Sequence, residues 1–205
     1  MNNLFFISKI GKILAERLGI QCYDKELLQK AAKDSGFAEE IFEKHDERPS
    51  SSFLYSLVMD SYSLGGYTTA PFLDMPLNHK IFLAQFDTIK KIANNESCVI
   101  VGRCADYALS DYPNAINVFI HADKEFKINR IAEQMNLSKE DAEDLITKTD
   151  KHRSSYYNYY TSKKWGSSQS YDLTLDSSKL GIEGCVAMIL KFREEMSKFR
   201  SENMK

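Results

Sequence analysis

The chain has 205 residues, 43% of them hydrophobic, and a formal net charge of −2. Such a length and apolar content can bury one substantial core, which argues against disorder and favours a single domain. Acidic and basic residues are intermixed, so the composition gives no reason to expect a nucleic-acid partner. No stretch approaches the roughly 20 apolar residues of a membrane span and no signal peptide is recognisable, so we expect a cytoplasmic protein.

The four cysteines, Cys22, Cys98, Cys104 and Cys185, are far apart in the sequence and most have apolar neighbours. None of them forms the Cys-x-x-Cys spacing that is typical of metal sites and redox motifs. We therefore interpret them as buried free thiols in a reducing compartment.

The first apolar run, Leu4–Ile7, predicts a short strand, and a helix is expected to begin at Ile10 and to end at Gly19. Nucleotide-binding α/β proteins place a glycine-rich loop between the first strand and the first helix, where backbone N–H groups hold phosphates. Here only Ser8 and Lys9 separate the two elements. The sequence therefore leaves no room for such a loop at this position.

Gln21–Tyr23 predicts a second short strand, which Asp24 ends, and Lys25–Lys33 predicts a helix. Asp24 is either the N-cap of that helix, the more common role of such a residue, or part of a site.

Residues 36–76 break the regular pattern with prolines, paired glycines and serines. We interpret this stretch as a mostly helical insertion over one edge of a site. The next stretch, Leu77–Asn94, predicts a long helix with Gln85 in its apolar stripe. Gln85 either faces a ligand or is a satisfied amide at the rim of the core, and the sequence does not decide between the two.

Cys98–Val101 is a continuous apolar, mostly β-branched run, which is typical of a strand covered on both faces. It ends at Gly102, and Arg103 follows at the carboxyl end, where open α/β sheets bind ligands such as phosphate. The alternative, that Arg103 caps a neighbouring helix, has about equal weight. With a helix over Cys104–Leu109 and a strand over Ile116–Ile120, the pattern predicts a parallel βαβ unit.

Lys124–Met135 predicts a helix, and Ser138 has the features of an N-cap for the next one. That helix leads into a segment rich in tyrosine and basic residues, residues 152–165. Such a cluster could stack a base or bind single-stranded nucleic acid, but composition favours tyrosines packed on the domain. Tyr171–Asp176 predicts the last strand, and a final amphipathic helix is expected from Ile182 to about Phe199.

Four segments in this order and spacing resemble the cytidylate kinase-like family, a branch of the P-loop nucleoside monophosphate kinases. They are IGKILAERLGIQCYDKELL, CVIVGRCADYAL, TDKHRSSYYNYYTSKKWG and YDLTLDSSKLGIE. The resemblance covers nearly the whole chain. It implies one α/β domain over residues 1–205, with a five-stranded parallel sheet flanked by helices. It also implies a monophosphate-binding insertion at 36–76 and a helical lid at 130–170.

The resemblance further implies phosphorylation of CMP or dCMP by ATP, with Mg²⁺ carried in by the nucleotide. Transfer of a phosphoryl group between two polyanions requires several cationic side chains. Carried over by position, the catalytic residues are Arg130, Arg153 and Asp150; the substrate-binding residues are Arg103, Asp24, Lys127 and Tyr157; and the residues at the phosphate donor are Lys9 and Gly11.

The sequence departs from the family in two places. Family members carry a glycine-rich run around the ATP β-phosphate, which has no counterpart at Ser8 and Lys9. One explanation is that the chain is a deletion variant, which would be an inactive nucleotide-binding or regulatory module. The other, which we favour, is that the polypeptide contains a loop that this sequence omits. His121 replaces an Asp of true cytidylate kinases, which weakens the argument for a pyrimidine acceptor.

Overall fold

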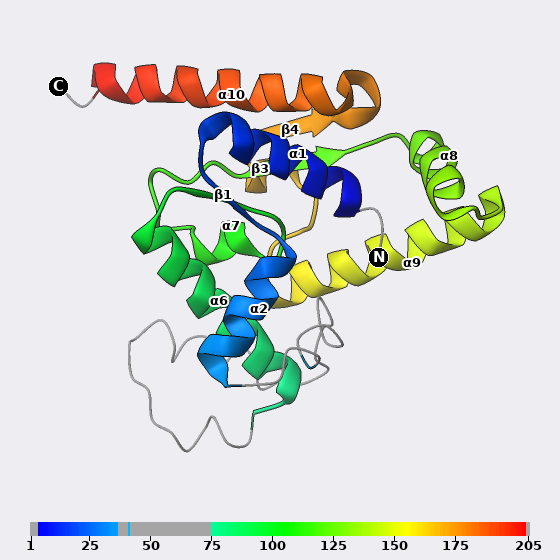
Figure 1. The fold of residues 1–205 in the computed structure, drawn as a ribbon, viewed down its shortest axis with the longest axis horizontal. Helices are drawn as coiled ribbons and strands as arrows, with labels where there is room; N and C mark the ends of the chain where they lie inside the picture. The colour runs from blue at the N-terminus through cyan, green and yellow to red at the C-terminus, as the bar shows by residue number, and fades with distance from the viewer. Residues whose placement is uncertain (1–3, 37–40, 42–74, 204–205) are drawn as a thin grey trace.

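The computed structural model describes residues 4–36, 41 and 75–203. The proposed insertion at 36–76 lies almost entirely outside this part of the chain and stays a prediction. In the described part, helices surround short parallel strands, as Figure 1 shows.

The N-terminal segment is a helix. Helix α1 spans Leu4–Leu18, so the strand predicted for Leu4–Ile7 is wrong. Phe6, Ile10 and Ile13 recur at the spacing of one helical face and pack in the same core cluster. A run of four apolar residues fits both a buried strand and a helix, and here the 3.6-residue period decides for the helix.

Four strands form two parallel pairs. Strand β1 (Gln21–Tyr23) pairs with β2 (Cys98–Ile100), and β3 (Val118–His121) pairs with β4 (Leu173–Asp176). Each of these strands overlaps a strand predicted from the sequence. The five-stranded parallel sheet is not present in the described residues, because its expected first strand is helical and the two pairs are separate ladders.

Helix α1 packs across both strand pairs. Ile10 and Leu14 are buried with Leu175 of β4, while Val99 of β2 and Val118 of β3 pack against the same cluster. Helix α10 (Ser177–Asn203) packs against α1 and contributes to the same cluster, and Figure 1 shows it along the top, over β4 and α1. One helix therefore holds the two strand pairs together.

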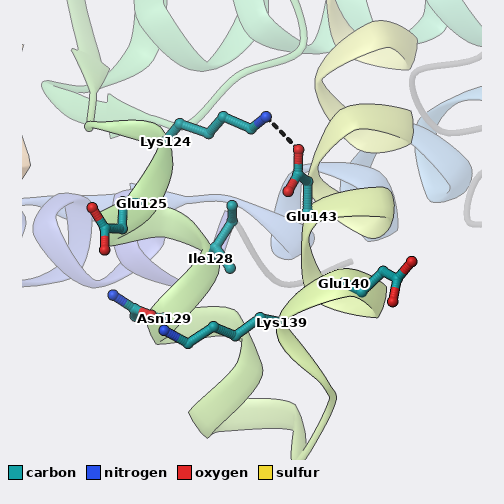
Figure 2. Close-up of a pocket in the computed structure, with 7 residues that line it drawn as sticks. All are labelled: Lys124, Glu125, Ile128, Asn129, Lys139, Glu140 and Glu143. Carbon is teal, nitrogen blue, oxygen red and sulfur yellow. Dashed lines mark hydrogen bonds and ion pairs between the residues drawn. The ribbon is translucent and has the colours of Figure 1, made fainter.

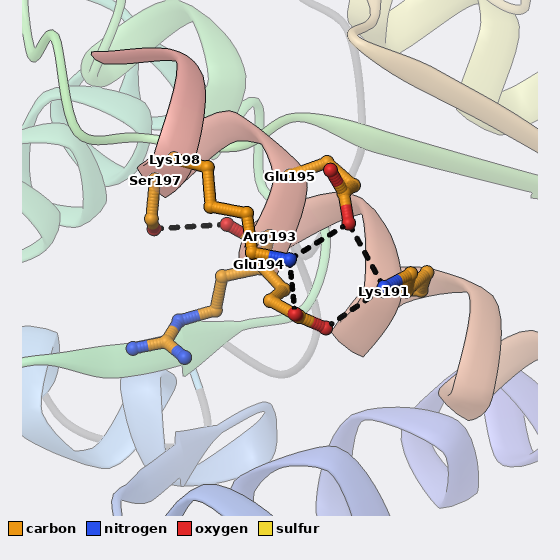
Figure 3. Close-up of polar contacts among 6 residues, drawn as sticks. All are labelled: Lys191, Arg193, Glu194, Glu195, Ser197 and Lys198. Atoms are coloured by element: carbon orange, nitrogen blue, oxygen red, sulfur yellow. Dashed lines mark hydrogen bonds and ion pairs between the residues drawn. The ribbon is translucent and has the colours of Figure 1, made fainter. Parts of the chain in front are cut away.

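Helix α10 begins at Ser177, directly after β4, and consists of two helical pieces, the second of which runs from Ile182, where the final helix was expected, to Asn203. Gly181 interrupts it with non-helical backbone, φ 64° and ψ −173°. On its solvent-exposed second half, Lys191 and Lys198 form ion pairs with Glu194 and Glu195, which Figure 3 shows in detail. These pairs link successive turns of one exposed helix, so they support that helix and form no site.

The opposite face of β1 and β2 is covered by α2 (Lys25–Ser35), α6 (Leu77–Asn95) and the short α7 (Ala105–Ala108). Their apolar side chains form one cluster that includes Leu27, Ile89 and Ile92. Strand β2 is therefore covered on both faces, as its continuous apolar run predicted.

Helices α8 (Lys124–Met135) and α9 (Lys139–Thr161) form a pair with a small core of its own, which includes Ile131 and Ala142. The N-cap expected at Ser138 is confirmed, since its hydroxyl accepts a hydrogen bond from the Asp141 backbone N–H at 3.0 Å. In Figure 1 α8 and the first half of α9 project at the right, and the second half of α9 returns toward α6. A 3₁₀ turn, Ser168–Ser170, then leads into β4.

Among the helices that the structure describes, none combines the length and the apolar character needed to cross a lipid bilayer.

Candidate functional site

Arg103 lies directly beyond β2 in an unusual turn. Gly102, Arg103 and Cys104 all have left-handed backbone, with φ of 74°, 56° and 55°. This conformation costs roughly 1–2 kcal/mol for each residue that is not glycine, so surrounding contacts must hold the turn. The Arg103 side chain is buried, with 3% of the residue exposed, and its Nη1 donates a hydrogen bond to the Val101 carbonyl oxygen at 3.3 Å. The turn therefore fixes a buried cation at the carboxyl end of β2.

Asp24 is the carboxylate that faces this cation. Its Oδ1 lies 3.9 Å from Nη1 of Arg103, and its Oδ2 accepts a hydrogen bond from the Ser8 hydroxyl at 2.6 Å. Asp24 occupies the N-cap position of α2, but its side chain makes no capping hydrogen bond there. Arg103, Asp24 and Ser8 therefore form one polar cluster, which joins β2, β1 and α1.

The lid region of the sequence prediction carries a second ionic cluster. Asp150 lies between two cations, with its Oδ2 2.7 Å from Nζ of Lys127 and its Oδ1 3.5 Å from Nη1 of Arg153. Asp150 therefore pairs with both Lys127 and Arg153. These three side chains are 10–24% exposed, which leaves them partly accessible to solvent.

Arg130 approaches the N-terminal end of α1. Its guanidinium carbon lies 4.3 Å from the ring centroid of Phe6 on α1 and 5.6 Å from that of Phe126 on its own helix. Burial lowers the pKa of Arg130, although a guanidinium keeps its charge at neutral pH. Arg130 therefore lies beside Phe6, in the first turn of α1. Phe6 is two residues before Ser8, which bonds to Asp24 beside Arg103.

Tyr157 links the Arg153 region to the Arg103 region. Its hydroxyl donates a hydrogen bond to Asp106 Oδ2 at 2.7 Å, and burial together with this bond raises the pKa of Tyr157. Asp106 follows Arg103 by three residues, and Tyr157 follows Arg153 by four, or about one helical turn. The turn of α9 after Arg153 thus packs against the turn after Arg103.

These contacts connect Arg103 and Arg130 to the N-terminal end of α1, and they connect the helix of Arg153 to α7. Arg103 reaches that end of α1 through Asp24 and Ser8, Arg130 reaches it through Phe6, and Arg153 belongs to the helix that Tyr157 attaches to α7. Figure 1 shows α1 with this end directed toward α9. A helix N-terminus favours negative charge, so the arrangement suits a phosphate-bearing ligand.

A family model for the cytidylate kinase-like family matches residues 8–179. The chain belongs to the cytidylate kinase-like family. Its structure is similar to the crystal structure of an uncharacterized protein from Eubacterium ventriosum ATCC 27560, with 32% identity, a TM-score of 0.65, and coverage of 90% of this chain and 89% of that one. A search of curated proteins found no significant match. Family membership indicates a kinase-like transferase that binds nucleotides.

The tyrosine-rich segment of this cytidylate kinase-like chain is mostly core. Tyr156, Tyr157 and Tyr160 are 4%, 5% and 1% exposed, and Tyr160 stacks on Phe82 with 4.1 Å between ring centroids. The packing interpretation is confirmed for these three rings, which offer no free face to a nucleic-acid base. Gln85 is 1% exposed and its Oε1 accepts a hydrogen bond from the Tyr156 hydroxyl at 3.2 Å, so its carbonyl oxygen serves the core.

Lys9 and Gly11 lie within α1 and form no loop. Lys9 is exposed, whereas Gly11 is buried where α1 crosses β1 and β2. A Cβ at position 11 would lie 3.0 Å from Val101 Cγ2 and 3.4 Å from Cys22 Sγ. Close helix–strand packing explains this glycine without a nucleotide, and the donor-binding role of both residues stays a prediction.

A surface depression of about 510 Å³ lies elsewhere, between α8 and α9, as Figure 2 shows. Its lining mixes both signs of charge, and Lys124 forms an ion pair with Glu143 across it. It is lined by Lys124, Glu125, Ile128, Asn129, Lys139, Glu140 and Glu143. None of the predicted site residues is among these, so the depression is not the candidate site.

Within the described ranges, no three His, Cys, Asp or Glu side chains are grouped so that they could hold a metal ion.

Sequence reasoning missed three residues of the candidate site: Phe6, Ser8 and Asp106. Helical periodicity through Phe6 and Ile10 could have placed Ser8 on a helix. For Asp106 the signal was weaker, because its partner is 51 residues away.

Proposed function

We propose that the chain is a nucleoside monophosphate kinase-like enzyme that transfers a phosphoryl group from ATP to CMP or dCMP. The observation that supports this proposal is that Arg103 and Arg130 both have partners on the first turns of α1, while Arg153 lies one helical turn from Tyr157, whose hydroxyl bonds to Asp106 just after Arg103. Phosphoryl transfer depends mainly on positioning two polyanions and neutralising their charge, which is the chemistry that guanidinium groups supply.

In this proposal Arg103 binds the phosphate of the acceptor monophosphate. Its contacts with Asp24 and the Val101 carbonyl hold the guanidinium in one orientation before the substrate arrives. Asp24 accordingly acts at the acceptor site through Arg103, and Tyr157 acts there by holding α9 against the turn that follows Arg103.

Arg130 and Arg153 are assigned to the phosphoryl group in transfer, because they come from the α8–α9 pair that the family likeness identifies as the lid. Asp150 holds Arg153 and Lys127 in place through its two oxygens. Mg²⁺ bound to ATP would supply the remaining positive charge between the β- and γ-phosphates. We expect small nucleotides as the partners and the cytoplasm as the location.

A second candidate is a module that binds a nucleoside monophosphate without transferring phosphate. The observation that favours it is helix α1 itself, which already occupies residues 4–18, so Lys9 and Gly11 form no glycine-rich phosphate loop. Without those backbone donors, ATP would lose several charge-assisted hydrogen bonds of about 1.5–3 kcal/mol each.

A coupled assay of ADP release with ATP and a panel of CMP, dCMP, UMP and AMP tests the first candidate. We expect turnover with CMP or dCMP, and no turnover with any acceptor contradicts the kinase proposal. Calorimetric titration with CMP and with ATP separates the second candidate, which binds CMP but not ATP. The intact mass should be measured on the same sample, because a mass above 23.5 kDa identifies additional polypeptide.

A further inference from the structure

The guanidinium of Arg130 lies between two aromatic rings. Phe6 and Phe126 have centroids 6.4 Å apart and an interplanar angle of 81°, so the rings form a corner. The Arg130 guanidinium carbon is 4.3 Å from the first ring and 5.6 Å from the second. Both distances are within the range of cation–π attraction.

The two rings come from different parts of the molecule. Phe126 and Arg130 are four residues apart on α8 and so share one helical face, whereas Phe6 lies in the first turn of α1. Ser8, two residues after Phe6, donates its hydrogen bond to Asp24, the carboxylate that faces Arg103. Phe6 therefore joins the helix of Arg130 to the end of α1 where Arg103 is held.

A guanidinium stacked on a ring keeps its N–H groups in its plane, where they can reach a phosphate, while its face is covered. Stacking also restricts the side-chain rotations of a long, flexible residue before a ligand arrives. A leucine in place of either phenylalanine would fill similar space but has no negatively polarised face. It would therefore not hold the Arg130 guanidinium in the same way.

We propose that Phe6 and Phe126 are positioning residues, which hold Arg130 in the orientation that its proposed contact with the transferred phosphoryl group requires. This inference rests on the proposed function for the identity of the ligand. The orientation itself is a property of the free protein and can be measured without any turnover.

The first experiment observes Arg130 directly by NMR of arginine side-chain Nε–Hε groups, with Arg130→Lys used to assign its signal. Ring currents should shift the Arg130 signal away from those of solvent-exposed arginines. We expect Phe6→Leu to remove most of this shift and Phe6→Tyr to retain it. Phe199→Leu is the matched control, since Phe199 is 67% exposed on α10, and it should leave the Arg130 signal unchanged.

The second experiment titrates the same samples with inorganic pyrophosphate. The Arg130 signal should move in the wild type and in Phe6→Tyr, and Phe6→Leu should bind on the order of fivefold more weakly. An Arg130 signal that Phe6→Leu leaves in place, or equal effects of Leu and Tyr at position 6, overturns the inference.

A kinetic comparison with ATP and CMP completes the test. Phe6→Leu and Phe126→Leu should lower kcat on the order of fivefold with little change in KM for CMP, and the tyrosine variants should recover most of it. If the wild type shows no turnover while the Arg130 signal responds as described, the kinase proposal fails and the positioning by the two rings stands. Equal kcat in the leucine and tyrosine variants of an active enzyme contradicts the positioning role.

Discussion

Two carboxylate–arginine clusters use the same chemistry in different surroundings: the body cluster of Asp24 and Arg103, and the lid cluster of Asp150 and Arg153 on the α8–α9 pair that is predicted to be a lid. Asp24 and Arg103 join β1 and β2, and their side chains are 10% and 2% exposed. Asp150 lies between Lys127 and Arg153 on the α8–α9 pair, where the side chains are 10–24% exposed. Burial makes an unpaired charge costly, so the body cluster should matter more for folding and the lid cluster more for function.

The strongest test of this contrast is Arg103→Met. The change leaves the Asp24 carboxylate buried and faced only by Ser8 among the partners described above. Loss of one member of a buried pair destabilises by about 3–5 kcal/mol, so we expect the midpoint of urea unfolding to fall strongly. Lys191→Met, on the exposed α10 network, is the control and should show no measurable change. Equal stabilities would mean that the body cluster contributes nothing to folding.

The lid cluster gives the opposite expectation. Arg153→Met should lower kcat about 100-fold, because a donor that stabilises charge in the transition state is lost. The free energy of unfolding should fall less than in Arg103→Met, because Asp150 keeps Lys127 as a partner. Asp150→Asn should have a smaller effect in the same direction, since Arg153 remains but loses its anchor. Steady-state kinetics and urea unfolding on one set of samples check both. A variant that loses stability and keeps its kcat would reverse the contrast.

Gly11→Ala tests how rigid the body is beneath α1. The added methyl group would lie 3.0 Å from Val101 Cγ2, which is closer than ordinary contact. We expect a net destabilisation of about 1–2 kcal/mol despite the better helix propensity of alanine. The double variant Gly11→Ala/Val101→Ala removes the methyl group that clashes, so it should show a smaller loss than the two single changes together. Additive losses would show that the clash is not the cause.

The smallest expected effect concerns pH. His79 on α6 is 3% exposed, its Nε2 lies 3.1 Å from the Tyr159 hydroxyl of α9, and burial lowers the pKa of His79. The lowered pKa means that the folded protein favours the neutral imidazole of His79. The resulting contribution to folding stability is fully present above pH 6.5, the ordinary pKa, and is lost as pH falls below it.

Thermal unfolding of the wild type and His79→Gln between pH 7.5 and pH 5 measures this contribution. The wild type should lose more stability than the variant over that interval, because only the wild type has to protonate a buried imidazole. Parallel curves for the two proteins would contradict the assignment to His79.

Local signals in the sequence predicted much of the helical structure. The bounds of α8 agree with the prediction, and the cap at Ser138 correctly marked the start of α9. Leu4–Ile7 failed because four apolar residues are too few to separate a strand from the first turn of a helix. The prediction of five strands depended on that segment and on the family likeness, and the described residues show four strands in two parallel pairs instead.

For the site, the sequence indicated the charged residues but could not give their partners. Arg103 was noticed because it follows a buried strand, whereas its pairing with Asp24 brings together residues 79 positions apart. Phe6 was assigned to a strand, so its contact with Arg130 had no counterpart in the prediction. Such contacts depend on how whole elements pack, which short-range patterns do not encode.

Helix α9 has a mechanical consequence because it is continuous from Lys139 to Thr161. The end of α9 that carries Tyr156, Tyr157 and Tyr160 is buried against α6. If α9 tilted, it would therefore pivot near Tyr157. At about 1.5 Å of rise per residue, Arg153 is roughly 6 Å from that pivot and Lys139 roughly 27 Å. The helix would then act as a lever whose outer tip travels about 4.5 times as far as Arg153. A large displacement of Lys139 at the tip would therefore move Arg153 only slightly.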